Sequence, residues 1–250
     1  MAEGTVTLAF IALAFLLAGF IKGATGVGLP TVVMGLLSIV MPPAQAAALM
    51  VLPAIATNIW QMAAGPALRA LLRRFTWMIV AIFVGTFSTI GLLTKTTSIA
   101  AAALGAVLAA YGAYGLLARR FEVRRAAERW LSPVIGLVTG MLSGATGVFV
   151  IPSLPYLTSL GMDREELVQS IGIAAFVCPL ALGLALAVNG QYRAEVAGSS
   201  FLALFPALAG MYVGQRLRRR LAAGTFTRWF FGALIALGGY MFLRSVRLIS

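Results

Sequence analysis

The chain of 250 residues carries a net charge of +12, and 61% of its residues are hydrophobic while only 10% are charged. This composition excludes a soluble globular domain and is typical of a chain that crosses a lipid bilayer several times. Histidine is absent and Cys178 is the only cysteine, which excludes intrachain disulfides, zinc sites built from His and Cys, and Ser-His or Cys-His catalytic pairs. The sequence indicates no cofactor and no metal.

The apolar segments predict five membrane elements in each half of the chain. They span 5–21, 29–41, 45–66, 76–94 and 97–118 in the first half, and 131–143, 149–160, 166–188, 195–215 and 226–246 in the second. Because a helix needs about 20 residues to cross a bilayer, we expect 29–41, 131–143 and 149–160 to be half-helices or hairpin arms. No basic region precedes 5–21, so this segment is expected to be a retained transmembrane helix rather than a signal peptide.

The longest charged run divides the chain into three parts. We predict a first membrane repeat over 1–118, a basic cytoplasmic linker over 119–130 and a second membrane repeat over 131–250. If the linker is cytoplasmic and the segments on either side of it cross the membrane in alternating directions, both termini are external. Cytoplasmic loops then hold Arg69, Arg73, Arg74, Arg119, Arg120, Arg124, Arg125, Arg129, Arg164, Arg216, Arg218, Arg219, Arg220 and Arg228, and the external side holds Lys95, Arg193, Arg244 and Arg247. This bias follows the positive-inside rule and explains the net charge without nucleic acid.

The pentapeptide GATGV occurs twice, at 23–27 and 144–148, with an offset of 121 residues. Proline follows both copies, at Pro30 and Pro152 with a one-residue slip, and Met41 falls on Met162. Chance is the alternative in a chain rich in Gly and Ala. Two homologous halves with an odd number of crossings must be inverted relative to each other. The sequence therefore predicts an all-α integral membrane protein, an inverted-topology repeat transporter with broken or short helices at its centre.

The two breaks are the predicted anion site. Glycine costs about 1 kcal/mol in a helix interior, and a break leaves backbone N–H groups and a positive dipole end that suit an anion. Lys22 precedes the first copy and Ser143 stands at the matching position of the second. The candidate substrate-binding residues are Lys22, Gly23, Thr25, Gly26, Asn58, Gln61, Ser143, Gly144, Thr146, Gly147 and Gln169.

Several candidates have a structural alternative. The glycines could serve only close helix packing, and Lys22 could extend to the membrane interface. Asn58, Gln61 and Gln169 could make hydrogen bonds between helices. All seven acids (Glu3, Glu122, Glu128, Asp163, Glu165, Glu166 and Glu195) fall in termini, loops or segment ends, which argues against cation transport.

At these residues the chain resembles the TauE/SafE family of sulfite exporters. The resemblance rests on a glycine-rich break after the first helix and on GLVTGMLSGATGVFVIPSL after a basic central loop, and it covers nearly the whole chain. It implies a bacterial inner-membrane protein that transports sulfite, thiosulfate or a small organosulfonate such as sulfoacetate, with export as the expected direction.

The expected function is transport of a small sulfur oxyanion, with the lipid bilayer and the anion as partners and the oligomeric state left open. A channel or uniporter for similar anions is the alternative, favoured by the lack of coupling carboxylates. An intramembrane enzyme is the third hypothesis, and no plausible base accompanies any Ser, Thr or Cys to support it.

Overall fold

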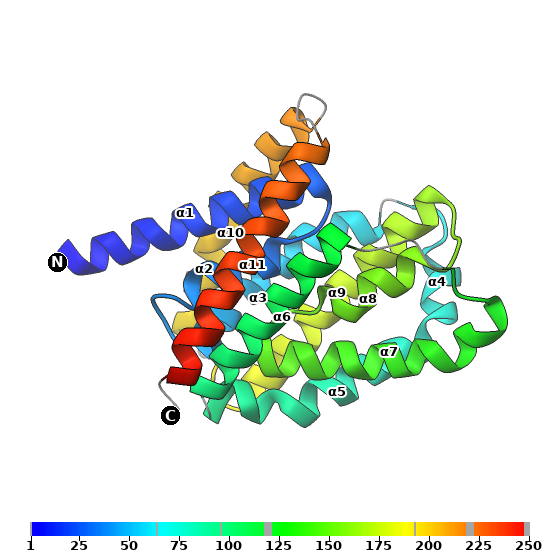
Figure 1. The fold of residues 1–250 in the computed structure, drawn as a ribbon, viewed down its shortest axis with the longest axis horizontal. Helices are drawn as coiled ribbons and strands as arrows, with labels where there is room; N and C mark the ends of the chain where they lie inside the picture. Colours follow the sequence, from blue (N-terminus) through cyan, green and yellow to red (C-terminus); the bar gives the residue numbers. More distant parts are fainter. Residues whose placement is uncertain are drawn as a thin grey trace.

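The computed structural model describes residues 2–63, 65–95, 97–117, 122–192, 194–218 and 223–247, and within these ranges every regular element is a helix (Figure 1). The elements are α1 (Ala2–Thr25), α2 (Leu29–Leu37), α3 (Pro43–Ala63), α4 (Leu68–Arg74), α5 (Thr76–Lys95), α6 (Thr97–Leu117), α7 (Arg125–Thr146), α8 (Val150–Thr158), α9 (Arg164–Val188), α10 (Ala194–Leu217) and α11 (Ala223–Arg247). The predicted all-α class is confirmed.

Among the described residues, seven helices are long and apolar enough to cross a membrane: α1, α3, α5, α6, α9, α10 and α11. Most of the predicted segments agree with these helices to within a few residues. The short helices α2 and α8 have nine residues each, about half of a membrane crossing. The chain is therefore a multi-pass membrane protein.

The prediction of a short element over 131–143 is wrong. Helix α7 has 22 residues, because it begins at Arg125 inside the predicted linker and continues to Thr146. Arg, Ala and Glu are strong helix formers, so the end of the charged run extends the helix instead of forming a loop. The hydropathy pattern also did not predict α4, a seven-residue helix between α3 and α5. Arg119 and Arg120 of the linker, and also Arg193, Arg219 and Arg220, lie outside the described residues.

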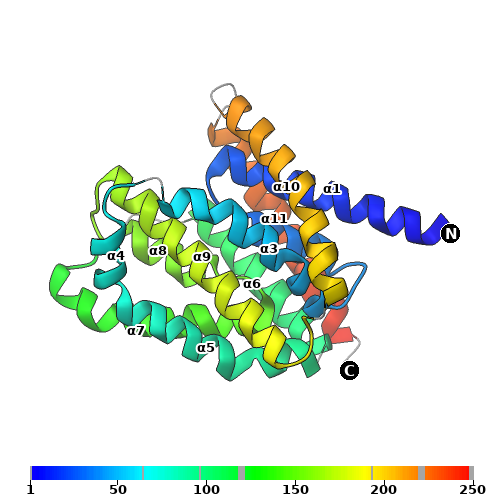
Figure 2. The same ribbon diagram turned by 180° about the vertical axis from the view of Figure 1, so that it is seen from behind.

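The principal helix pairs combine the two halves of the chain. Helix α5 packs along α7, α6 along α11, α1 along α10 and α3 along α9. Figures 1 and 2 show α5 and α7 side by side along one edge, while the N-terminal part of α1 projects beyond the bundle. Each of these pairs takes one helix from the region before the linker and one from the region after it.

Glycines allow the closest of these approaches. A Cβ atom at Gly85 of α5 would lie 2.2 Å from the carbonyl oxygen of Leu137 in α7. In the α1–α10 pair, a Cβ atom at Gly23 would lie 2.2 Å from the carbonyl oxygen of Met211, and one at Gly144 in α7 would lie 2.3 Å from that of Thr86. No side chain fits at such distances, so helix packing accounts for Gly23 and Gly144.

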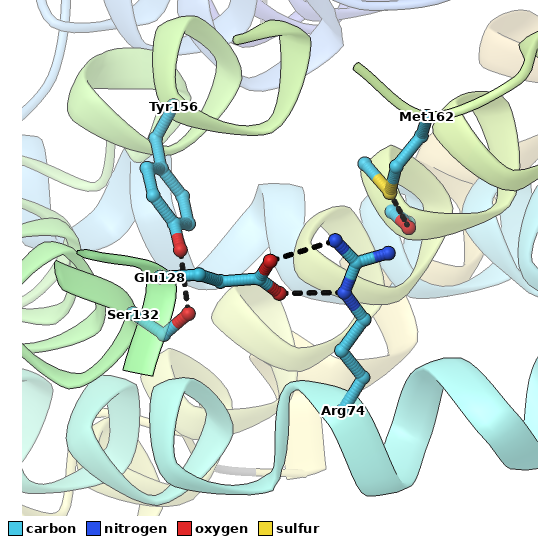
Figure 3. A network of polar contacts seen from close by, with 6 residues as sticks. Arg74, Glu128, Ser132, Tyr156 and Met162 are labelled. Carbon is cyan, nitrogen blue, oxygen red and sulfur yellow. Dashed lines mark hydrogen bonds and ion pairs between the residues drawn. The ribbon is translucent and has the colours of Figure 1, made fainter. Parts of the chain in front are cut away.

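Polar contacts join the ends of α4, α7 and α8 (Figure 3). Arg74 donates from Nε and Nη2 to the two carboxylate oxygens of Glu128, at 2.5 and 2.8 Å, and this bond raises the pKa of Arg74. The hydroxyls of Ser132 and Tyr156 are 2.6 Å apart. The bidentate ion pair between Arg74 and Glu128 has the geometry in which an Arg–carboxylate contact contributes most to stability. It connects α4, from the first half, to α7, from the second.

Candidate functional site

The two GATGV copies have the same local conformation. The helix continues through Gly-Ala-Thr and ends at the second glycine, so the break is shorter than predicted and lies at 26–28 and 147–149. Gly26 and Gly147 have φ of 87° and 73°, the left-handed conformation that commonly ends a helix. In each copy the threonine hydroxyl donates to the carbonyl four residues before it and accepts from the N–H two residues after it (Thr25 with Ile21 and Val27, Thr146 with Leu142 and Val148). Both threonine hydroxyls are therefore bonded to the backbone next to their own break.

Short helices follow both breaks, and no side chain caps either of them. Gly28, with φ of 105°, is the N-cap residue of α2, and Phe149 is that of α8. The backbone of α8 is irregular at Ile151, so its regular part is shorter than that of α2. An uncapped start leaves the first N–H groups of a helix available to another acceptor.

The starts of α2 and α8 line one cavity, which we name the central chamber. The centre of a water molecule can move through only about 30 Å³ of it, enough for one or two waters. Its polar side chains are Lys22, Asn58 and Ser153. The other lining residues are Gly26, Val27, Gly28, Pro30, Phe149, Val150, Leu154, Leu157, Ile171, Ala174 and Ala175.

Lys22 points into the protein rather than toward a membrane interface. It is 5% exposed, and its Nζ donates to Oδ1 of Asn58. Asn58 is itself fixed, because its Nδ2 donates to the carbonyls of Ala54 and Ala175 at 2.7 and 2.8 Å. No carboxylate lines the chamber, and no described acid pairs with Lys22. The alternative of a lysine that extends to the interface therefore does not fit this structure.

A larger cavity, which we name the vestibule, adjoins the central chamber. It has a volume of about 340 Å³ and shares Lys22, Gly26, Val27 and Ile171 with the chamber. Its other lining residues are Gly23, Thr25, Thr57, Gln61, Val168, Met211, Gln215 and Arg218. Arg218 follows α10 and is exposed. The buried ammonium of Lys22 thus borders both cavities.

The remaining predicted site residues lie elsewhere. Ser143, Gly144, Thr146 and Gly147 line neither cavity, and the fully buried hydroxyl of Ser143 has no hydrogen-bond partner among the described residues. Gln169 holds the turn after α3, because its side chain bonds the backbone of Met62, Gly65 and Ala67 at 2.8, 2.8 and 3.0 Å.

Sequence reasoning missed Thr57, Ser153, Gln215 and Arg218 as cavity residues. Arg218 was predicted only to be a cytoplasmic charge. Ser153 directly follows Pro152 behind the second break, which is the one local signal that could have identified it. Thr57 lies one residue before Asn58 in α3. Gln215 has no such signal, because its position at the vestibule depends on the packing of α10 against α1.

Comparison with known proteins identifies a family. The family described as "Sulfite exporter TauE/SafE" matches residues 11–241 of the chain, which confirms the resemblance found in the sequence. No curated protein and no solved structure matches the chain.

Proposed function

The chain belongs to the TauE/SafE sulfite exporter family, a membrane transporter family, and from this premise we propose that it moves a small sulfur-containing oxyanion through the central chamber. Sulfite, thiosulfate and an organosulfonate such as sulfoacetate are the proposed substrates, and export across the bacterial inner membrane is the proposed direction.

The observation that carries this proposal is the buried Lys22 without an acid beside it. Removing an ammonium from water costs several kcal/mol unless an opposite charge or good hydrogen bonds compensate. Asn58 supplies one hydrogen bond and no charge. A bound oxyanion would supply the charge, and the uncapped start of α2 would add N–H donors at a positive dipole end. The chamber as it stands admits water only, so binding an anion requires the helices around it to move apart.

The arrangement of helix pairs supports the proposed inverted repeat. The 121-residue offset matches α1 with α7, and chain order then matches α2 with α8, α3 with α9, α5 with α10 and α6 with α11. Exchanging the halves converts the α1–α10 pair into the α7–α5 pair, and converts the α3–α9 and α6–α11 pairs into themselves. An internal two-fold relation of this kind is typical of transporters with a site between their repeats.

The vestibule supports the export direction. Arg218 belongs to the arginine-rich region that the positive-inside rule assigns to the cytoplasm, so the vestibule is proposed to open there. A cationic mouth raises the local concentration of anions and their rate of entry. A cytoplasmic anion would pass Arg218, reach Lys22 and enter the chamber.

Topology is the first test. Single cysteines introduced at residue 2, at Lys95 and at residue 249 are expected to react with a membrane-impermeant maleimide from outside. Cysteines at Arg74, Arg125 and Arg219 should react only after the membrane is opened. The native Cys178 is fully buried and provides a low background. Labelling of the two termini from opposite sides would contradict the inverted repeat.

Transport is expected to proceed without a protein carboxylate. Glu122→Gln and Glu195→Gln should each retain flux within about twofold, because both acids are exposed and neither lines the chamber or the vestibule. Asp163 is excluded from this test, because its side chain accepts from the N–H of Glu166 and caps α9. Radiolabelled sulfite flux into proteoliposomes is the measurement. Loss of flux in either variant would show that an acid participates.

The same absence of acids favours the second candidate, an anion uniporter or channel. Among the described residues, no acid lines the central chamber or the vestibule. Flux that follows the sulfite gradient and ignores imposed pH and sodium gradients would identify the uniporter. Accumulation of sulfite against its gradient under an imposed ion gradient would identify a coupled transporter.

A further inference from the structure

A third cavity lies away from the central chamber and shares no residue with it. It has a volume of about 640 Å³, and we name it the α5–α11 pocket. It is lined by the turn between α2 and α3, the end of α5, the start of α6 and the last turns of α11 (Ser38, Ile39, Val40, Met41, Pro42, Pro43, Lys95, Ser98, Ala101, Tyr240, Met241, Arg244 and Ser245). The topology proposed above places this pocket at the external surface of the membrane.

The charges in this pocket are all positive. Lys95 and Arg244 both line it, no Asp or Glu does, and neither cation forms an ion pair with a described acid. Both are exposed, so they remain hydrated and available to a ligand. Each lies in the last turn of its helix, α5 or α11, where the helix dipole favours a cation. The helix dipole explains why a cation is favourable at each helix end. It does not explain why Lys95 and Arg244 line the same pocket.

Hydroxyl-bearing side chains supplement the two cations in the lining of the pocket. They are Ser38, Ser98, Tyr240 and Ser245. The Oγ of Ser38 is buried away from the cavity, so this hydroxyl is not counted among the ligand donors. Hydroxyl groups and cationic side chains are the donors that an oxyanion accepts from in a protein site.

We infer that the α5–α11 pocket binds an oxyanion, with Lys95 and Arg244 as charge partners. Arg presents a planar fork that matches two oxygens of a phosphate or sulfonate group, and Lys supplies a point charge. A free inorganic anion and the phosphate of an anionic lipid share this chemistry. Exposed Ile39 and Val40 at the rim would contact the acyl chains of a lipid. This site is independent of the central chamber and of the function proposed for it.

Two binding measurements on the intact protein separate the sources. Calorimetry with inorganic phosphate in phosphatidylcholine nanodiscs tests a free anion. Native mass spectrometry after extraction from bilayers of phosphatidylglycerol and phosphatidylcholine tests lipid retention. Both are performed in the Lys22→Met background, so that the central chamber does not contribute. The variants are Lys95→Gln, Arg244→Gln and their combination. The matched control is Arg247→Gln, an exposed arginine in the same last turn that does not line the pocket.

The combined Lys95→Gln and Arg244→Gln variant is expected to lose at least tenfold in affinity, while Arg247→Gln stays within twofold. Loss of phosphate binding assigns the site to a free anion. Loss of phosphatidylglycerol retention alone assigns it to a lipid headgroup. If neither ligand binds, or if binding is the same in the combined variant, the inference is overturned. Because these measurements use Lys22→Met, binding at the α5–α11 pocket can be detected whether or not the central chamber binds a substrate anion.

Discussion

The variant Lys22→Met is expected to bind sulfite at least tenfold more weakly than the wild type and to lose most of its transport. A tenfold loss corresponds to about 1.4 kcal/mol. Hydrogen bonds between a charged donor and an oxyanion are roughly twice as strong as neutral ones, and burial strengthens them further. Because Lys22 is 5% exposed and no described acid lines its chamber, a substrate anion would depend on this one full charge. Methionine preserves the length and apolar character of the side chain, so the loss isolates the ammonium.

The matched control is Arg69→Gln, which removes a positive charge from an exposed position on α4 outside both cavities. It should leave affinity and flux within about twofold of the wild type. Calorimetry on monodisperse protein gives the affinity, and proteoliposome flux gives the transport rate. Thermal unfolding verifies that each variant is folded. Wild-type affinity in folded Lys22→Met would remove Lys22 from the substrate site and reject the proposed chamber.

The second large effect is expected from Gly85→Val in α5. The added Cβ would meet the carbonyl oxygen of Leu137 at 2.2 Å and the backbone nitrogen of Met141 at 2.7 Å, so α5 and α7 would have to separate. Forcing extra atoms into a packed contact costs about 3 kcal/mol at the upper end of the usual range. For a chain of this length, that cost lowers the melting temperature by roughly 6–12 °C. Thermal unfolding followed by size-exclusion chromatography in detergent is the measurement.

Gly91→Val provides the control on the same helix. A Cβ atom at Gly91 meets no other atom within 4 Å. Both substitutions add the same side chain to a helical glycine of α5, so the difference between them reports the contact with α7 alone. Gly91→Val should keep the melting temperature within about 2 °C, since propensity effects at a single position without a packing contact are below about 1 kcal/mol. Equal melting temperatures in the two variants would mean that α5 and α7 are not packed this closely.

Hydropathy and segment length were enough to predict most of the helices, because a bilayer admits few alternatives to an apolar helix. Helix boundaries were harder to predict at the end of the first repeat and the start of the second. The charged residues before Leu131 signalled a loop, yet they extend α7 by about two turns, because a helix outside the apolar region can carry charge on every side. Hydropathy has no means of separating a charged loop from a charged helix.

The candidate site was predicted in part. The GATGV repeat and the charge of Lys22 identified the first break, and Asn58 was found as a polar residue within an apolar helix. Arg218 and Gln215 could not be identified, because they reach the vestibule only through the packing of α10 against α1. Gln169 had the same sequence signal as Asn58, but it bonds the backbone of the turn after α3. A polar residue in an apolar helix indicates a buried partner and does not specify which one.

The helix pairs have a consequence for how the chain could be divided. The glycine faces of α1 and α7 are matched by helices from the other half, α10 and α5, and the Arg74–Glu128 pair adds a polar connection between the halves. A half expressed alone would leave these faces without partners. Two fragments produced separately, with the division after residue 117, are therefore expected to assemble with each other into one particle. A gene split at this point would behave as an obligate two-subunit transporter.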